Sequence, residues 1–308
     1  MKKVAASAVW TFLLIAALGA FLVACAEAPP PVEIGPTVTL VAGVTPTPGP
    51  TVLSVDESRI AAEIRRRGPI DFGFACALPY TGWNPRMMMP EGVVADLQDL
   101  IQKRFERRGG YGWMKEWDNV LPGLEEEHQV ITLDGPGYRP EFEGRVEFIP
   151  IMERGYCFLA RADDDRFNEF EDILQPDIVF AAVKGTDGDY VLKNEYPEVE
   201  LDSVKGKYAE DSIKEVLSGE ADVTFAYSSA IPGILEVLPQ LKAFPSDCQE
   251  NPIWPAEWGI MVPKGDPVWR QWVQDLVDEL SDSGWFEERL EHWSQPENLK
   301  PLIRTPSP

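Results

Sequence analysis

The clearest pattern of hydrophobic and polar positions along the chain lies between residues 178 and 227. Residues 178–183 (IVFAAV) and 221–226 (ADVTFA) are short apolar runs, which are typical of strands buried in a parallel sheet. Between them, the segments 189–196 and 212–217 have the composition and the end signals of helices. This alternation predicts a β-α-β-α-β lobe.

A glycine turn, residues 184–188 (KGTDG), joins the first of these strands to its helix. At such a turn, free backbone N–H groups and the positive end of the helix point toward whatever lies above the sheet. The turn is therefore a candidate ligand site. A turn that only reverses the chain is an alternative that the pattern leaves open.

The earlier part of the chain predicts a second α/β unit. Residues 70–77 (IDFGFACA) alternate apolar and small side chains like a core strand, and a loop with aromatic side chains follows at 78–85 (LPYTGWNP). A helix comes next, and its apolar face is made by Val94, Leu97, Ile101 and Phe105.

Composition narrows the class of partner. The chain has 308 residues, which is long enough for two domains, and its 28 basic and 51 acidic residues give a formal net charge of -23. Nucleic acid is excluded as a partner, because binding phosphates requires a basic face. The acidic surface is interpreted as a source of solubility.

The first 25 residues look like a bacterial lipoprotein signal. Lys2 and Lys3 precede an apolar run over 9–23, and the run ends in a lipobox at 22–25 (LVAC). We expect Cys25 to be acylated, so that the protein is extracytoplasmic and anchored to the cell membrane. A transmembrane anchor is the alternative, because an apolar run of about 20 residues is long enough to span a bilayer.

A proline-rich segment with almost no charge follows at 26–53, and it predicts an extended tether. Three cysteines remain after the lipobox: Cys76, Cys157 and Cys248. One disulfide is possible, but the sequence does not choose the pair. The two histidines have no metal-ligand spacing, so we expect neither a metal nor another cofactor.

Four further motifs lie between about residue 60 and residue 293: GVVADL at 92–97, WDNVLPGL at 117–124, GEAD at 219–222 and WGIMVPKGDP at 258–267. Together they resemble the type 2 periplasmic solute-binding proteins of ABC importers, in particular their polar amino-acid-binding branch. The C-terminal motif is the most specific of the four. The first differs from the family's Gly-Phe-Asp-Val-Asp-Leu by the loss of one aspartate at Val94.

The resemblance implies an α/β fold of two lobes, each a mixed sheet flanked by helices, joined by two hinge strands with the ligand between the lobes. The hinge strands are expected at 155–161 and 257–262. The expected division is 54–158 and 262–296 for lobe 1, 159–261 for lobe 2, and 297–308 for a C-terminal tail.

The two charged anchors of the family are replaced in this sequence. Amino-acid-binding members hold the ligand carboxylate with the arginine of a Thr-Pro-Glu-Arg motif, and here residues 139–142 are Arg-Pro-Glu-Phe. Phe142 therefore stands at the arginine position, and Tyr227 stands where the family has the aspartate that binds the ammonium group. Because an unpaired buried ammonium costs several kcal/mol, we expect free α-amino acids to bind poorly.

The resemblance assigns the ligand site to seven residues: Tyr80, Trp83, Arg139, Gly185, Thr186, Asp187 and Tyr227. The three residues of the glycine turn stand where the family binds the ligand carboxylate. Tyr80 and Trp83 offer flat faces for stacking, with ordinary loop packing as the alternative. Arg139 either pairs with an anion in the cleft or is a surface residue. The expected ligand is a small polar solute, amino-acid-related or an organic anion.

The implied function is that of a lipid-anchored, monomeric solute-binding protein that delivers its ligand to the permease of an ABC importer. No reaction is expected, and no catalytic residue is assigned. Two alternatives remain open. One is a dehydratase-like periplasmic enzyme on the same scaffold, using the Asp187 carboxylate in the cleft. The other is a sensor lobe.

Overall fold

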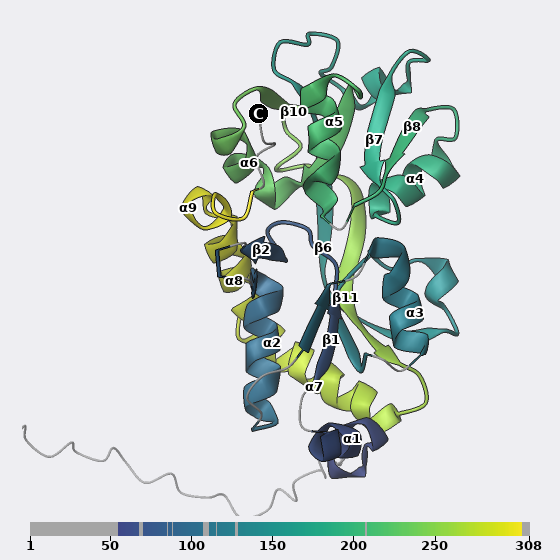
Figure 1. The fold of residues 1–308 in the computed structure, drawn as a ribbon, viewed down its shortest axis with the longest axis vertical. Coiled ribbons are helices and arrows are strands. Elements are labelled where there is room, and N and C mark those ends of the chain that lie inside the picture. The colour runs from purple at the N-terminus through teal and green to yellow at the C-terminus, as the bar shows by residue number, and fades with distance from the viewer. Residues whose placement is uncertain are drawn as a thin grey trace, which may run out of the picture. The chain divides into compact units, whose positions relative to one another are not determined.

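The structure is a computed structural model (Figure 1) and describes residues 55–67, 70–84, 86–87, 89–106, 111–114, 116–126, 129–206 and 208–303. The predicted lipidation site Cys25 and the tether at 26–53 lie outside the described residues, as does the end of the tail, 304–308. No helix among the described residues is long and apolar enough to cross a membrane.

Within the described residues, one mixed sheet has the strand order β4-β1-β5-β11-β6-β9-β7-β8, with β10 paired to β6. Its strands are β1 (Asp71–Phe74), β4 (Tyr111–Met114), β5 (Ile131–Asp134), β6 (Val146–Arg161), β7 (Val179–Val183), β8 (Glu200–Val204), β9 (Val223–Tyr227), β10 (Leu241–Phe244) and β11 (Ile253–Pro263). A separate small sheet pairs β2 (Gly82–Asn84) with β3 (Met89–Glu91).

Two long antiparallel strands, β6 and β11, connect the two parts of this sheet (Figure 1). The first half of β6 pairs with the second half of β11, which also meets β5. The second half of β6 pairs with β9 and β10. The fold is therefore two-lobed: strands β1 to β5 belong to lobe 1, strands β7 to β10 belong to lobe 2, and β6 and β11 pass between them. The exact division given above stays a prediction.

Helices flank the sheet in both lobes (Figure 1). Those of lobe 1 are α1 (Arg59–Arg67), α2 (Val93–Arg104), α3 (Val120–Glu125), α7 (Pro267–Asp282) and α8 (Trp285–Ser294). Those of lobe 2 are α4 (Asp187–Glu195), α5 (Ile213–Ser218) and α6 (Ile231–Val237), and α9 (Pro296–Leu299) packs against α6. Short 3-10 turns lie at Val55–Glu57, Trp117–Asn119, Pro140–Phe142, Phe170–Leu174, Ala209–Ser212 and Ser228–Ala230.

The β-α-β-α-β pattern predicted from the sequence is present in lobe 2. Strand β7 pairs in parallel with β8 on one side and with β9 on the other, and α4 and α5 lie between these strands along the chain. Gly219 ends α5 in a left-handed conformation, with φ of 82°, as expected for a glycine that closes a helix. The hydrophobic pattern predicted the order of β7, α4, α5 and β9, but it gave no residue range for β8.

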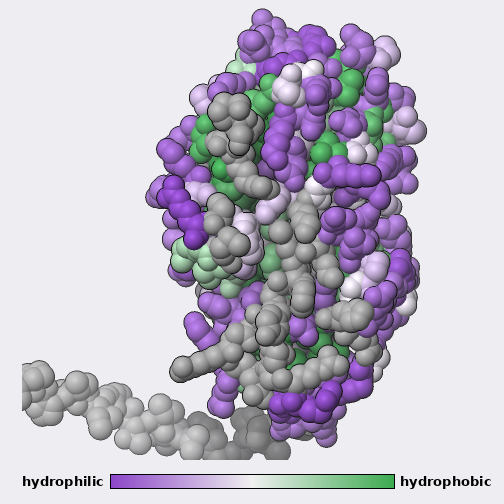
Figure 2. All heavy atoms as spheres, in the orientation of Figure 1, coloured by the Kyte–Doolittle hydropathy of each residue, from purple (hydrophilic) through white to green (hydrophobic). Residues whose placement is uncertain are grey.

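Apolar side chains form two core clusters. The larger follows the sheet through both lobes, and the smaller lies in lobe 2 between β6, α5 and α6. The smaller cluster also takes in Leu78 from lobe 1 and Leu299, Leu302 and Ile303 from the C-terminal segment. On the face shown in Figure 2, hydrophilic residues cover most of the described surface, in agreement with the large negative charge.

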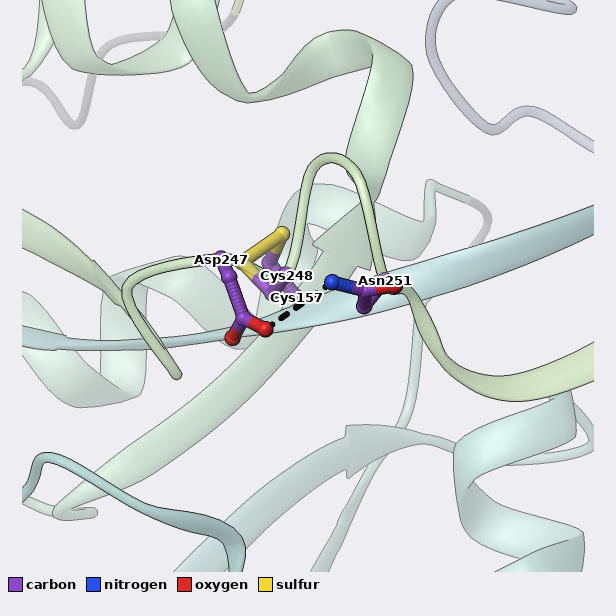
Figure 3. The surroundings of a disulfide bond; sticks show 4 residues. All are labelled: Cys157, Asp247, Cys248 and Asn251. Atoms are coloured by element: carbon purple, nitrogen blue, oxygen red, sulfur yellow. Dashed lines mark hydrogen bonds between the residues drawn. A yellow bond between two sulfur atoms is a disulfide. The ribbon is translucent and has the colours of Figure 1, made fainter.

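A disulfide between Cys157 and Cys248 resolves the pairing that the sequence left open (Figure 3). Cys157 lies on β6, and Cys248 lies in the loop between β10 and β11, which an Asp247–Asn251 side-chain hydrogen bond of 3.0 Å also braces. The two cysteines are 91 residues apart in the sequence and both are buried in the smaller core cluster. Cys76 is buried and takes no part in this bond.

Because the disulfide closes a long loop, removing it should destabilise the fold. We expect the double variant Cys157→Ala/Cys248→Ala to lose about 2–5 kcal/mol of unfolding free energy. Urea unfolding, followed by fluorescence with and without a reductant, measures this loss. The wild type under reductant should approach the double variant, which itself should not respond to reductant. Equal stability of the oxidised wild type and the double variant would contradict the pairing.

Candidate functional site

Four buried charged side chains meet where the two lobes face each other: Asp134, Arg139, Arg154 and Asp187. Asp134 ends β5, Arg139 lies in the loop that follows, Arg154 is on β6, and Asp187 begins α4. The set contains two cations and two anions, so its formal charge is zero. This balance matters, because an uncompensated buried charge costs several kcal/mol.

The Asp187 carboxylate is the centre of this cluster and is only 6% exposed. One oxygen, Oδ1, accepts hydrogen bonds from the Gly137 backbone N–H at 2.9 Å and from Arg139 Nη2 at 3.2 Å. The other, Oδ2, accepts from the Tyr156 hydroxyl and lies 3.7 Å from Arg154 Nη2. Gly137 and Arg139 belong to lobe 1 and Asp187 to lobe 2, so this carboxylate links the lobes.

The glycine turn before α4 fixes the position of Asp187. Gly185 has a φ of +84°, and a Cβ there would lie 2.7 Å from the Asp118 backbone nitrogen, so both conformation and space require glycine. Its N–H donates to Asp189 Oδ2 at 3.0 Å, and its carbonyl accepts from Arg139 Nη2 at 3.0 Å. The Thr186 hydroxyl caps α4 and donates to the Val183 carbonyl at 2.6 Å. The polar groups of the turn that we assigned to a ligand thus have partners within the protein.

Arg154 packs between the Asp134 carboxylate and the rings of Tyr80 and Tyr227. Its guanidinium donates to Asp134 Oδ1 at 3.0 Å and to the Gly135 carbonyl at 2.6 Å. It lies 4.6 Å from the ring centroid of Tyr227 and 5.2 Å from that of Tyr80, within the range of cation–π contacts. Burial raises the pKa of Asp134 to about 6, while Arg154 opposes the shift, so the carboxyl is ionised at neutral pH.

Tyrosine rings complete the cleft. Tyr227 stacks on Tyr156 with 4.7 Å between ring centroids and meets Tyr80 edge-on at 5.0 Å. Burial raises the pKa of Tyr80 to about 12, so its hydroxyl stays protonated. Tyr80, one of the two rings predicted to stack on a ligand, is thus in contact with Tyr227 and with Arg154.

Six of the seven predicted site residues therefore come together between the lobes, and Trp83 does not join them. Trp83 lies half-buried on β2 opposite Pro90 of β3. Arg139, for which a surface position was one alternative, is only 8% exposed and is held between the lobes. Whether these residues bind a ligand stays a prediction.

Two cavities adjoin the cluster. The first, about 10 Å³, has room for no more than one water molecule and is lined by residues that include Thr186, Asp187 and Tyr227. The second, about 220 Å³, opens beside it and is lined by Trp117, Arg139, Phe142, Gly185 and Met261 among others. Trp117 lines both cavities. Both lobes contribute to the larger one, since Gly185 belongs to lobe 2.

Two side-chain N–H groups at the larger cavity lack an acceptor among the described residues: Trp117 Nε1 and Arg139 Nε. Trp117 is 2% exposed, so its indole N–H is shielded from bulk solvent. Leaving a buried donor unpaired costs about 1–3 kcal/mol. These two donors suit a ligand that brings a hydrogen-bond acceptor.

The sequence did not point to several residues of this site: Trp117, Asp134, Arg154, Tyr156 and Glu210. Trp117 was visible only as the start of the WDNVLPGL motif. Arg154 was the most predictable of these residues, because it directly precedes the expected hinge strand, and a charged side chain that is buried there needs a partner. Nothing in the local pattern named that partner.

Glu210 forms a separate contact between the lobes. Its Oε1 accepts a hydrogen bond from the Leu78 backbone N–H at 2.7 Å. Burial raises the pKa of Glu210 from 4.5 to about 7, with the Leu78 hydrogen bond opposing the shift. Glu210 also lines the smaller cavity, so its charge state changes the electrostatics of that cavity.

The raised pKa of Glu210 predicts a pH-dependent stability. Protonation favours the folded state, so this contribution is complete below about pH 4.5 and is lost as the pH rises through about 7. In Glu210→Gln, which keeps an acceptor for Leu78 and cannot ionise, the fall in unfolding free energy between pH 5 and pH 8 should be smaller by about 1–3 kcal/mol. Urea unfolding across this range measures it. The exposed Glu195→Gln serves as the control, and identical pH profiles for Glu210→Gln and wild type would contradict the prediction.

Comparison with known proteins places the fold. No protein-family model and no curated protein matches the sequence. Among solved structures, a mutant of ArgBP from T. maritima matches with a TM-score of 0.66 and 22% identity, over 76% of this chain and 98% of that chain. An ancestral amino acid-binding protein, a precursor of cyclohexadienyl dehydratase, matches with a TM-score of 0.66 and 23% identity, over 76% and 99%.

A binding component of an ABC transporter from Wolinella succinogenes, complexed with lysine, is also similar, with a TM-score of 0.66, 20% identity and coverage of 76% and 99%. At this level of identity the likeness concerns the fold. The chain has the two-lobed α/β fold of the type 2 periplasmic solute-binding proteins.

Proposed function

We propose that this protein is a lipid-anchored, extracytoplasmic solute-binding protein that holds a small polar solute between its lobes and passes it to an ABC importer. The observation that carries the proposal is the cavity of about 220 Å³. Its wall comes from both lobes and includes Trp117 and Arg139, whose buried Nε1 and Nε donors have no acceptor among the described residues.

The lining of the cavity favours a solute with one acceptor head and an apolar body. The donors Trp117 Nε1 and Arg139 Nε suit a carboxylate or a similar acceptor, and a hydrogen bond to a charged group is stronger than one between neutral groups. Phe142, Met261 and Pro136 offer apolar surface in the same cavity. A small organic anion with a flat or branched apolar part fits these features.

The other charges at the cavity are already paired. Arg145 binds Glu125 through two hydrogen bonds of 2.7 Å, and Asp118 pairs with Lys184 at 2.6 Å. The Asp118–Lys184 pair joins lobe 1 to lobe 2, but it is exposed, and solvent-exposed ion pairs contribute little to stability. It is therefore a weak barrier to opening of the lobes when a solute enters or leaves.

The matched structures support a binding role. They include a lysine complex of an ABC-transporter component and arginine-bound ArgBP. The dehydratase alternative is supported by one matched structure, the ancestral precursor of cyclohexadienyl dehydratase, and it needs a carboxylate free to take up a proton. Asp187, the candidate for that role, has both oxygens engaged by hydrogen bonds, which favours the binding role over the enzymatic one.

A solute screen tests the proposal. We expect benzoate, phenylacetate or isovalerate to raise the melting temperature of the purified full chain, with the amides of the same acids and the twenty amino acids much weaker. Trp117→Phe keeps an aromatic ring and removes the N–H donor, so it should weaken binding of the best anion about tenfold to a hundredfold. Titration calorimetry measures both effects.

Trp285→Phe, which lies on α8 and outside the lining of the larger cavity, is the matched control and should bind the anion like the wild type. Micromolar binding of any free amino acid would show that the ligand class is that of the matched structures instead. Equal affinity of Trp117→Phe and wild type would place the solute elsewhere.

Anchoring at Cys25 is a separate part of the proposal, supported by the lipobox at 22–25. We expect Cys25→Ala to remain unprocessed and to lose incorporation of labelled palmitate, because the thiol that receives the lipid is gone. Cys76→Ala, in the same expression host, should be labelled like the wild type. Normal labelling of Cys25→Ala would contradict lipidation at this site.

A further inference from the structure

We infer that Asp187 occupies the anion site of the cleft as an internal substitute for a solute carboxylate, so that it closes the lobes without solute and excludes carboxylates from that site. The first part concerns the fold alone, and only its consequence for specificity rests on the proposed function.

The donors around Asp187 converge as they would on a bound anion. A backbone N–H from Gly137, a guanidinium N–H from Arg139 and the Tyr156 hydroxyl all donate to the two carboxylate oxygens, and Arg154 Nη2 lies 3.7 Å away. Backbone N–H groups together with guanidinium groups are the usual partners of a bound carboxylate. None of these donors belongs to α4, the helix that carries Asp187.

The carboxylate is presented to these donors by a fixed backbone. Thr186 caps α4 directly before Asp187, and the turn at Gly185 packs closely against Trp117 and Asp118 of lobe 1. An anion attached to the chain at this point competes with free anions at a high effective concentration. The space beside it, about 10 Å³, does not admit a second carboxylate.

Two consequences follow. The lobes of the wild type should be closed in the absence of solute, whereas solute-driven hinge closure would need an open ligand-free state. A solute carboxylate cannot reach the Gly137 N–H, so a solute is restricted to the larger cavity, where Trp117 Nε1 and Arg139 Nε have no acceptor among the described residues.

Chemical rescue tests this inference with the full chain. Asp187→Gly removes a group whose atoms correspond to acetate. We expect the variant to have a larger radius of gyration than the wild type by small-angle scattering. Acetate should return it to the wild-type value and raise its melting temperature, with a dissociation constant on the order of 1 mM for so small a ligand. Acetamide, which has the same shape without the charge, should not do so. The wild type should not respond to acetate beyond a sodium chloride control.

Two further variants keep the test decisive. Asp187→Ala preserves helix propensity at the start of α4 and leaves space for formate, so formate should replace acetate if the glycine variant does not fold. Asp266→Gly removes another buried carboxylate at the start of a helix, α7, one whose partners Ser58, Ile60 and Trp269 all lie in lobe 1. This control should keep the wild-type radius of gyration, with or without acetate.

Folded Asp187 variants that keep the wild-type radius and show no response to acetate or formate would overturn the inference, as would equal acetate binding by the wild type. Rescue by acetamide at the same concentration would overturn it too. If the wild type binds no solute in the screen while acetate closes Asp187→Gly, the proposed solute-binding role fails and the assignment of Asp187 stands.

Discussion

The arrangement of the two lobes depends on the burial of Arg154. Its side chain is almost fully removed from solvent, so its charge must be balanced on the spot by Asp134 at 3.0 Å and by the more distant Asp187. Asp134 ends β5 in lobe 1, and Asp187 begins α4 in lobe 2. A displacement of either lobe would leave an ion unpaired. Buried ion pairs add little net stability, but a cluster of this kind penalises every other placement of the lobes.

Neighbouring residues of strand β6 contribute to both the buried charged cluster and the disulfide. Arg154 and Tyr156 are two residues apart, so they lie on the same face of the strand and both reach Asp187. Cys157 points to the opposite face and forms the disulfide within lobe 2. Gly155 stands between them because a Cβ there would lie 2.4 Å from the Pro252 side chain. The polar cluster and the disulfide are thus set by neighbouring residues of one strand.

The sequence was sufficient for the order of β7, α4, α5 and β9, because their hydrophobic periods are local properties of the chain. The two-lobed fold could be predicted for the same reason, since each of the four motifs that indicate it is a short run of residues. The partners of Asp187 were not predictable in this way. Tyr156 is 31 residues away from it and Gly137 is 50, and no periodicity relates such positions.

The disulfide pairing and the unpaired donors could not be predicted, because they depend on which residues approach each other in the folded chain. Three cysteines gave three possible pairs, and only the approach of Cys157 to the loop before β11 selects one. A sequence also does not show that Trp117 Nε1 and Arg139 Nε lack an acceptor among the described residues, because this depends on every neighbour in the fold. The resemblance predicted that the charged anchors were replaced at Phe142 and Tyr227, but it gave no sign of the contact between Arg154 and Asp187.

Arg139 contacts Asp187 and also lines the larger cavity. Its Nη2 donates to Asp187 and to the Gly185 carbonyl of lobe 2, while its Nε has no acceptor among the described residues. A solute that accepts from Nε would leave both contacts between the lobes intact and would hold the guanidinium in the orientation that makes them. A solute that competed for Nη2 would break them. Since a ligand favours the state in which it gains most contacts, the first kind of solute stabilises the closed lobes and the second kind opens them. The geometry of one guanidinium therefore decides whether binding and closure support or oppose each other.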